Sequence, residues 1–129
     1  MMRGLPLPLT IAITIIVLAF AGLASAADYQ KMEVVDIKLD ARSLEGKKVE
    51  ISGFMAQVMT IPAISNTAYG VSIYVDPTSL SREERRAIMV NCTNTNCRAR
   101  LRGVVKMVSG PGLSPQWGIV ADSVEVSPR

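Results

Sequence analysis

The residues best suited to chemistry are four basic side chains in the second half of the chain. Arg98, Arg100, Arg102 and Lys106 are separated by even numbers of residues, so in a β-strand they share one face. Such a face can bind nucleic acid, anionic polysaccharide or lipid head groups, the more so if the arginines of residues 82–86 point the same way. The alternative is a solvated outer strand, on which charge blocks pairing with other sheets.

Few aromatic side chains accompany these cations. Tyr69, Tyr74 and Trp117, with Phe54, are candidates for stacking on a ligand, because binding modules for single strands place exposed aromatics beside a basic groove. The alternative for each ring is packing at the rim of the core.

Two cysteines, Cys92 and Cys97, are separated by four turn-tolerant residues. In an oxidising compartment so close a pair favours a structural disulfide. Free thiols, a redox pair or a metal site are the alternatives. A redox pair usually has two intervening residues, and no further metal ligands stand at a suitable spacing.

The composition argues against an enzyme. The chain has no histidine, which is the commonest general base and metal ligand. The carboxylates of Asp36, Asp40, Asp76 and Asp122 are dispersed along the chain, and no glycine-rich segment has the form of a phosphate-binding loop. We therefore expect a non-enzymatic protein with no metal and no cofactor.

The N-terminus has the features of a signal peptide. A positive charge at Arg3 precedes a long uncharged apolar run, and Ala24-Ser25-Ala26 supplies small residues for cleavage before Ala27. The prediction is a signal helix and peptide over residues 1–26 and a periplasmic or secreted mature protein. In the alternative, the segment stays uncleaved and residues 9–27 anchor the chain in a membrane, which would be its only contact with the membrane.

The predicted mature part has 103 residues, enough for one domain with a modest core. Without Arg3, 13 basic residues face 11 acidic ones, so its net charge is +2. This balance does not by itself indicate a polyanionic partner. The sequence does not identify the partner. The candidates are an anionic ligand and an envelope protein, with nucleic acid as a less favoured alternative.

Hydrophobic alternation predicts a mainly β domain over residues 34–126, after a mobile polar lead-in at residues 27–33. Strands are expected over residues 48–59, 69–75, 97–108 and 117–126, and a short strand or extended entry over residues 33–44. Residues 61–68 and 109–116 are expected as loops. Val71 and Met107 are assigned to inward faces, and Gly53 to a bulge or sharp bend.

One helix is predicted over residues 81–91. Ser81 and Glu84 fit a capping box, in which each side chain satisfies backbone donors of the first turn. Leu80, Ile88 and Cys92 fall on one face at helical spacing.

This order of elements resembles an OB-fold, a small five-stranded Greek-key barrel with one helix before the fourth strand. Residues 44–53 (LEGKKVEISG), 100–105 (RLRGVV) and 118–124 (GIVADSV) resemble the first, fourth and closing strands of that fold. The chain is therefore similar to exported bacterial OB-fold proteins and, more distantly, to anticodon-binding-like OB domains. A clear third barrel strand between Val75 and Ser81 is missing, so either residues 33–39 enter the sheet or the barrel is incomplete.

The resemblance implies a fold and little about function, since its motifs consist of glycines and alternating apolar residues. We expect an exported, non-enzymatic small β-barrel that acts as a binding module. Its ligand is unknown, and an anion is one candidate. A nucleic-acid-binding OB domain and a membrane-anchored structural or interaction protein are the alternatives.

Overall fold

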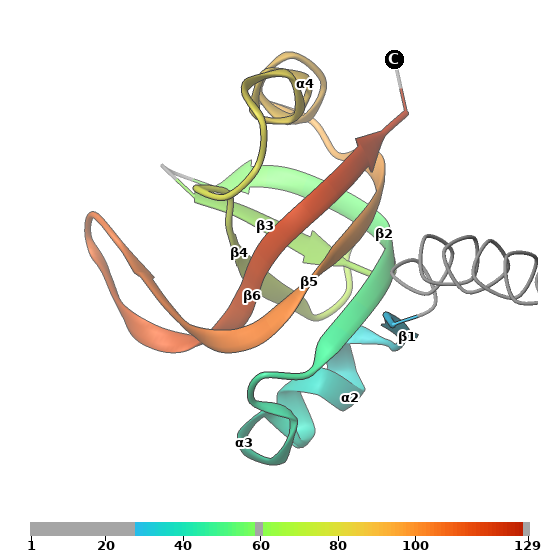
Figure 1. The fold of residues 1–129 in the computed structure, drawn as a ribbon. Helices are drawn as coiled ribbons and strands as arrows, with labels where there is room; N and C mark the ends of the chain where they lie inside the picture. The colour runs from blue at the N-terminus through green and yellow to red at the C-terminus, as the bar shows by residue number, and fades with distance from the viewer. Residues whose placement is uncertain (1–27, 59–60, 128–129) are drawn as a thin grey trace, which may run out of the picture.

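The computed structural model describes residues 28–58 and 61–127, and these carry the mainly β fold (Figure 1). The predicted signal helix and its cleavage site before Ala27 lie outside the described residues. Within these two ranges, no helix is long and apolar enough to cross a membrane.

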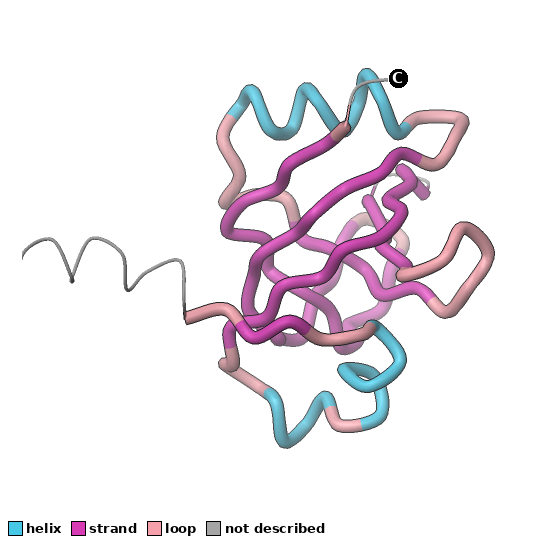
Figure 2. Tube along the Cα trace, turned by 90° about the vertical axis from the view of Figure 1, so that its right-hand side faces the viewer, coloured by secondary structure: helices cyan, strands magenta, loops and turns pink. Residues whose placement is uncertain are grey.

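Six strands and three helices make up the fold. In chain order they are β1 (Gln30–Lys31), α2 (Val34–Leu39), α3 (Ala41–Leu44), β2 (Lys48–Val58), β3 (Ile61–Ser65), β4 (Ser72–Asp76), α4 (Arg82–Cys92), β5 (Cys97–Gly110) and β6 (Leu113–Val126). Figure 2 shows the strands between two helical regions, with α4 at one end and α2 and α3 at the other.

Five of the strands form a closed ring of hydrogen bonds. β2 pairs with β3, β3 with β4, β4 with β6, β6 with β5, and β5 returns to β2. The β4–β6 pairing is parallel and the other four are antiparallel. The sixth strand, β1, adds to β2 in parallel. Two residues of the predicted lead-in thus belong to the sheet.

The core fills the inside of the ring. Alternate side chains of β2 and β5 point inward and are almost wholly buried, and they meet inward residues of the other strands. The largest of these fully buried side chains on the strands include Ile51, Met55, Ile64, Ile73, Leu101 and Ile119.

β2 curves strongly and changes partners along its length (Figure 1). Its first half pairs with β1, whereas β3 joins it only from Phe54 onward. A Cβ atom at Gly53 would overlap the carbonyl oxygen of Ser65, so the close approach of the β3 backbone requires glycine there. The predicted bend at Gly53 thus coincides with the point where β3 joins.

Three segment predictions were wrong. Residues 33–44 form helices α2 and α3, because Val34, Ile37 and Ala41 are buried at helical spacing. The segment predicted as a loop over residues 61–68 begins with β3, and this strand, rather than one between Val75 and Ser81, completes the ring. Neither an entry of residues 33–39 into the sheet nor an open ring is found.

The third wrong segment is the predicted loop over residues 109–116. β5 and β6 continue as a long hairpin whose turn is only Pro111 and Gly112, with Gly112 at a φ of 74°. The end of this hairpin projects beyond the ring (Figure 1). Met107 lies in it and is 48% exposed, so its predicted inward position was wrong.

Val71 was also assigned wrongly to the core. It is 52% exposed, because β4 begins one residue later, at Ser72. Its strand neighbours Ile73 and Val75 are buried as predicted.

The helix and the disulfide were predicted correctly. In α4, Ser81 and Glu84 form both hydrogen bonds of the capping box, and Ile88 and Cys92 are buried. Cys92 ends the helix and Cys97 begins β5, and their disulfide joins Cα atoms 4.9 Å apart. The bond therefore fixes one end of α4 to the edge of the ring.

Candidate functional site

The row of basic side chains lies on the outer face of β5, as its alternation predicted. In the register of β2 and β5, Arg98 is opposite Phe54, Arg100 is opposite Ser52, and Arg102 is opposite Glu50. The basic side chains therefore stand beside the outward residues of β2, and each has different surroundings.

Arg100 is paired with a neighbour on the other side. Its guanidinium forms a salt bridge with the carboxylate of Glu125, directly opposite on β6. Both side chains are largely exposed, 45% and 70%. The charge of Arg100 is offset at the surface of the protein itself.

Arg102 forms a more enclosed ion pair. Its Nε lies 2.8 Å from Oε1 of Glu50, whose side chain is only 6% exposed. The hydrogen bond from Arg102 to Glu50 raises the pKa of the arginine above its usual range, so the guanidinium stays charged at every ordinary pH. Arg102 is thus committed to neutralising a buried carboxylate.

The segment before β1 covers this ion pair. The Tyr29 hydroxyl donates to Oδ2 of Asp122 over 2.8 Å, and the Arg102 guanidinium lies 5.8 Å from the Tyr29 ring centre. Lys48 lies 5.6 Å from the same ring and 3.8 Å from a carboxylate oxygen of Asp28. Desolvation, followed by the bond to Asp122, raises the pKa of Tyr29. No local pattern predicts this contact, because Tyr29 and Asp122 are 93 residues apart.

Arg98 differs from the other two arginines. Its guanidinium lies over the ring of Phe54, 5.4 Å from the ring centre, and forms no ion pair with any residue in the described ranges. It is exposed and lines a groove of about 320 Å³ together with Ser52, Phe54, Asn66 and Ser127. The guanidinium of Arg98 therefore shares this groove with the hydroxyl groups of Ser52 and Ser127 and the amide group of Asn66.

Asn66 lines this groove and also a second, adjoining groove. Its Nδ2 donates to the carbonyl oxygen of Ser52 over 3.1 Å, and its Oδ1 accepts the backbone N–H of Val34 over 2.6 Å. The side chain thereby fixes the start of α2 to the middle of β2. Asn66 was not predicted as a site residue, because a lone asparagine in a loop resembles any turn residue.

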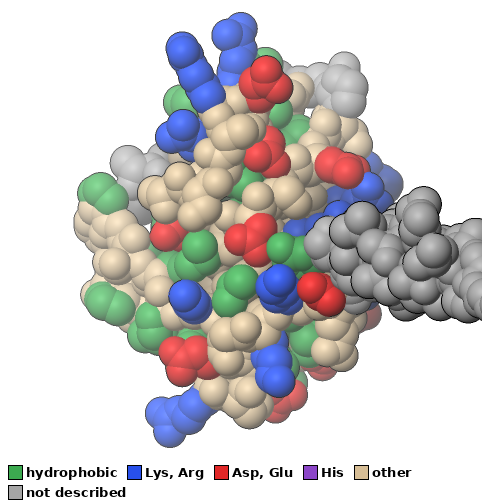
Figure 3. Space-filling view, viewed as in Figure 1, with side chains coloured by type: hydrophobic (Ala, Val, Ile, Leu, Met, Phe, Trp, Pro, Cys, Tyr) green, Lys and Arg blue, Asp and Glu red, His purple; other side chains and the backbone are tan. Residues whose placement is uncertain are grey.

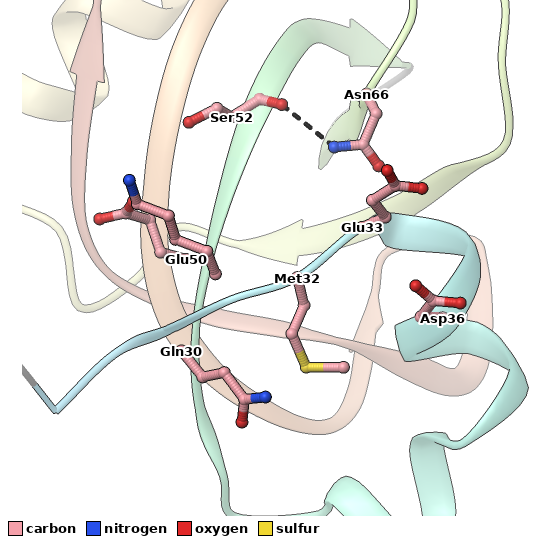
Figure 4. A pocket seen from close by; sticks show the side chains of 8 residues that line it. Gln30, Met32, Glu33, Asp36, Glu50, Ser52 and Asn66 are labelled. Carbon is pink, nitrogen blue, oxygen red and sulfur yellow. Dashed lines mark hydrogen bonds between the residues drawn. The ribbon is translucent and has the colours of Figure 1, made fainter.

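A second groove of about 450 Å³ shares Ser52 and Asn66 with the first and continues beneath α2 (Figure 4). Glu33 and Asp36 stand on its α2 side, and Met32 lies between α2 and β2 in this view. The two adjoining grooves together extend along the outer face of β2, with Arg98 lining the first and the carboxylates of Glu33, Asp36 and Glu50 lining the second. We call this the β2 channel.

The structure separates the remaining predicted site residues. Lys106 is exposed farther along β5, toward the hairpin, and has no ion pair among the described residues. Trp117 is half-buried against the core, and Tyr74 is half-buried on β4. These two rings are therefore packed partly into the fold, which is the alternative of packing at the rim of the core.

Tyr69 is different, because its side chain is 99% exposed. It lies in the loop between β3 and β4, and the amide of Asn96 donates to the carbonyl oxygen of the preceding residue, Ala68, over 3.0 Å. This bond holds the loop beside the start of β5, the strand that carries Arg98.

The acidic residues offer little for catalysis or for a metal ion. Among the residues that the structure describes, no group of three or more histidine, cysteine, aspartate or glutamate side chains could hold a metal. Asp122 is bonded to Tyr29, and Asp76 accepts hydrogen bonds from the backbone and side chain of Thr78. The carboxylates of Asp76 and Asp122 are thus engaged by groups of the protein itself.

Comparison with known proteins does not identify a family. No family model matches the chain, and no curated protein matches it.

Proposed function

We propose that this chain is an exported, non-enzymatic OB-fold module that binds an anionic ligand in the β2 channel, with Arg98 as the principal contact. The fold assignment is supported by the ring order β2-β3-β4-β6-β5. It is also supported by the helix α4, which lies between β4 and β5, the third and fourth ring strands in chain order. This is the order expected of a five-stranded OB barrel, to which β1, α2 and α3 are added.

Export is proposed from the N-terminal sequence. The apolar run and Ala24-Ser25-Ala26 support cleavage before Ala27 and a periplasmic or secreted location. Intact-mass measurement of the protein recovered from outside the cytoplasm tests this: its N-terminal residue should be Ala27. A full-length species held in the membrane would favour the anchor formed by residues 9–27.

The absence of enzymatic activity is proposed from the residues at hand. The sequence has no histidine, and in the described part of the chain no hydrogen bond joins the Ser52 hydroxyl, which lines the β2 channel, to the carboxylates of Glu33, Asp36 or Glu50. Glu50 is already paired with Arg102. Binding needs only complementary groups, which the channel has.

The observation that carries the ligand proposal is the state of Arg98. Arg100 and Arg102 are neutralised by Glu125 and Glu50, whereas Arg98 has no carboxylate partner among the described residues. Its planar guanidinium is held over Phe54, which restricts its motion and leaves its N–H donors for a bidentate oxyanion such as phosphate, sulfate or carboxylate. Ser52 and Asn66 line the same groove and add polar contacts.

Calorimetric titration at low salt tests the proposal. Inorganic phosphate, a sulfated heparin oligosaccharide and a short single-stranded DNA serve as probes for the wild type and for Arg98→Gln. At least one probe should bind the wild type, and Arg98→Gln should weaken that binding about tenfold or more, the loss typical of a charged hydrogen bond. Lys106→Gln is the matched control, because it removes one exposed charge from the same strand.

The outcomes separate the site from general charge attraction. Binding that depends on Arg98 and not on Lys106 supports the β2 channel. Equal losses in both variants would indicate only nonspecific attraction to the basic strand, and would contradict the proposed site. So would the absence of binding to all three probes.

Single-stranded nucleic acid is the second candidate, and one observation favours it. Tyr69 is almost completely exposed, and its loop is held beside the start of β5, so a base could stack on this ring while a phosphate contacts Arg98. In that case Tyr69→Ala should weaken DNA binding and leave phosphate binding unchanged. The affinity for DNA should also fall steeply as salt rises.

A further inference from the structure

The outer face of α4 combines two features that are costly on an isolated protein surface. Arg82, Arg85 and Arg86 are exposed on it, and beside them Met89 is 66% and Val90 is 61% exposed. The opposite face of the helix is packed on the ring through Ile88 and Cys92. We call the five outward residues the α4 outer face.

The arginines of the α4 outer face are poorly compensated. None of them forms an ion pair with a residue in the described part of the chain. Arg82 and Arg86 are four residues apart, and Arg82 and Arg85 three, so their like charges repel. They also stand in the first half of α4, where the helix dipole disfavours positive charge, and the last turn has no basic residue.

The acidic residues near them do not remove this excess. Glu84 turns toward the ring, where its carboxylate accepts the backbone N–H of Val124 over 2.8 Å and that of Ser81 over 3.0 Å. Only Glu83 is left to face the three arginines on the outer side of the first turns. The α4 outer face therefore keeps a net positive charge, which an external anion would neutralise.

The surface between these side chains is hollowed rather than smooth. Arg82, Arg85, Arg86, Met89 and Val90 line a depression of about 580 Å³. Figure 3 shows basic side chains standing out over α4 at the top of the view, next to hydrophobic atoms. A partner that fits here must offer negative charge and an apolar surface within the length of one short helix.

We propose that the α4 outer face docks onto an anionic lipid surface. The arginines would contact lipid phosphates, and Met89 and Val90 would enter the boundary between head groups and acyl chains. A bilayer presents anions and hydrocarbon in adjacent layers, which is the combination found on this face. Nucleic acid supplies the charge without an apolar layer for Met89 and Val90. The proposal is independent of ligand binding at Arg98.

A tryptophan placed on the face tests the proposal. Val90→Trp is introduced into the full chain, and the wild type supplies the baseline from Trp117. Vesicles of phosphatidylcholine, alone or mixed with phosphatidylglycerol, carry brominated acyl chains that quench a tryptophan only when it enters the membrane. Quenching of Trp at position 90 is expected with the anionic vesicles and not with phosphatidylcholine alone.

Two charge variants in the Val90→Trp protein identify the contact. Replacing Arg82, Arg85 and Arg86 by glutamine should raise the lipid concentration for half-maximal quenching about a hundredfold. The matched control replaces three exposed cations elsewhere, Arg42, Lys47 and Lys106, and should change it little. Residues 1–27 are the same in every variant, so a difference between the two triple variants comes from the replaced cations.

Several outcomes would overturn the proposal. These are no quenching at position 90 with anionic vesicles, equal quenching with phosphatidylcholine alone, and equal effects of the two triple variants. Arginine-dependent binding of single-stranded DNA or polyglutamate without quenching by vesicles would also overturn it, because the partner would then be a soluble polyanion. Circular dichroism of each variant confirms that α4 is still folded.

Discussion

The carboxylate of Glu50 lies 2.8 Å from Nε of Arg102 and is shielded from water by the strands on either side of it. Three arginines that look equivalent in sequence thus differ in role. Arg102 compensates a buried charge, Arg100 forms an exposed pair with Glu125, and Arg98 has no ion pair with a described residue. Only the last has its charge available for a ligand.

Arg102→Gln should destabilise the protein more than Arg100→Gln. Loss of Arg102 leaves the carboxylate of Glu50 buried without a compensating charge, at a cost of about 2–3 kcal/mol. Loss of Arg100 breaks a solvent-exposed pair and should cost less than about 1 kcal/mol. Urea unfolding followed by circular dichroism measures both changes.

A double variant checks the cause. In Glu50→Gln/Arg102→Gln the unpaired charge is gone, so the combined loss of stability should be smaller than the sum of the two single losses. Strict additivity would show that the two side chains do not interact energetically.

Asn66→Asp should loosen the attachment of α2. A carboxylate can still accept the N–H of Val34, but it cannot donate to the carbonyl oxygen of Ser52 as the amide does. We expect a loss of about 1–2 kcal/mol in the free energy of unfolding. On this substitution, amide hydrogen exchange should accelerate more in α2 than in α4, which would show that the effect lies at α2.

The opposite result has a clear meaning. If amide hydrogen exchange in α2 is as slow in Asn66→Asp as in the wild type, the hydrogen bond from Asn66 to Ser52 does not stabilise the attachment of the helix. Asn91→Asp is a matched control, because its amide donates only to the carbonyl oxygen of Ala87 within α4.

Breaking the disulfide should cost little stability. Cys92 and Cys97 are five positions apart, and closing so short a loop restricts the unfolded chain by only about 2 kcal/mol. Cys92→Ser should therefore lower Tm by a few degrees and leave the fold intact. Thiol labelling of native, non-reduced protein should find no free cysteine, and stoichiometric labelling would disprove the bond.

Acid should destabilise the protein partly through Glu84. Desolvation raises the pKa of Glu84, but hydrogen bonds from the backbone N–H groups of Ser81 and Val124 and from the Ser81 side chain outweigh it and lower the pKa below 4.5. The unfolded state therefore binds the proton more readily. The stability contributed by Glu84 is complete above pH 4.5 and is lost as the pH falls through the lower, folded-state pKa.

Glu84→Gln tests this contribution. The variant should be less stable than the wild type at neutral pH, and the difference should shrink as the pH falls below about 4. Urea midpoints measured along the pH series give the comparison. A difference that stays constant with pH would show that the charge of Glu84 has no part in capping α4 or in holding Val124.

Alternation and capping were sufficient to predict the long elements. The row of Ala99, Leu101 and Val105 identifies the inward face of β5, and Ser81 with Glu84 identifies the start of α4, because both patterns depend on local geometry. The proximity of Cys92 and Cys97 likewise predicted their bond correctly.

The misread segments depend on contacts distant in sequence. β3 is only five residues long and contains Pro62, so its local pattern resembles a loop, and its place is fixed by pairing with β2 and β4. The helical spacing of Val34, Ile37 and Ala41 was readable, but alternate apolar residues in the same segment favoured a strand.

The candidate site was predicted only in part. The shared face of the arginines followed from strand geometry, and the pairing of β5 with β6 places Arg100 opposite Glu125. The pairing of Arg102 with Glu50 and the joining of two grooves at Asn66 depend on the β2–β5 register and on the start of α2, neither of which a local pattern specifies.

Mapping the bound ligand by NMR tests the central claim most directly. With the oxyanion probe that binds best, the account predicts that the Arg98 Nε–H signal and the amide signals of Ser52 and Ser127 shift together and saturate. The Nε–H signals of Arg100 and Arg102 should change little, because the guanidinium of each is already bonded to a carboxylate, through Nη2 in Arg100 and through Nε in Arg102. Saturable shifts centred on Arg100, Arg102 or Lys106, with Arg98 unchanged, would contradict a ligand site in the β2 channel.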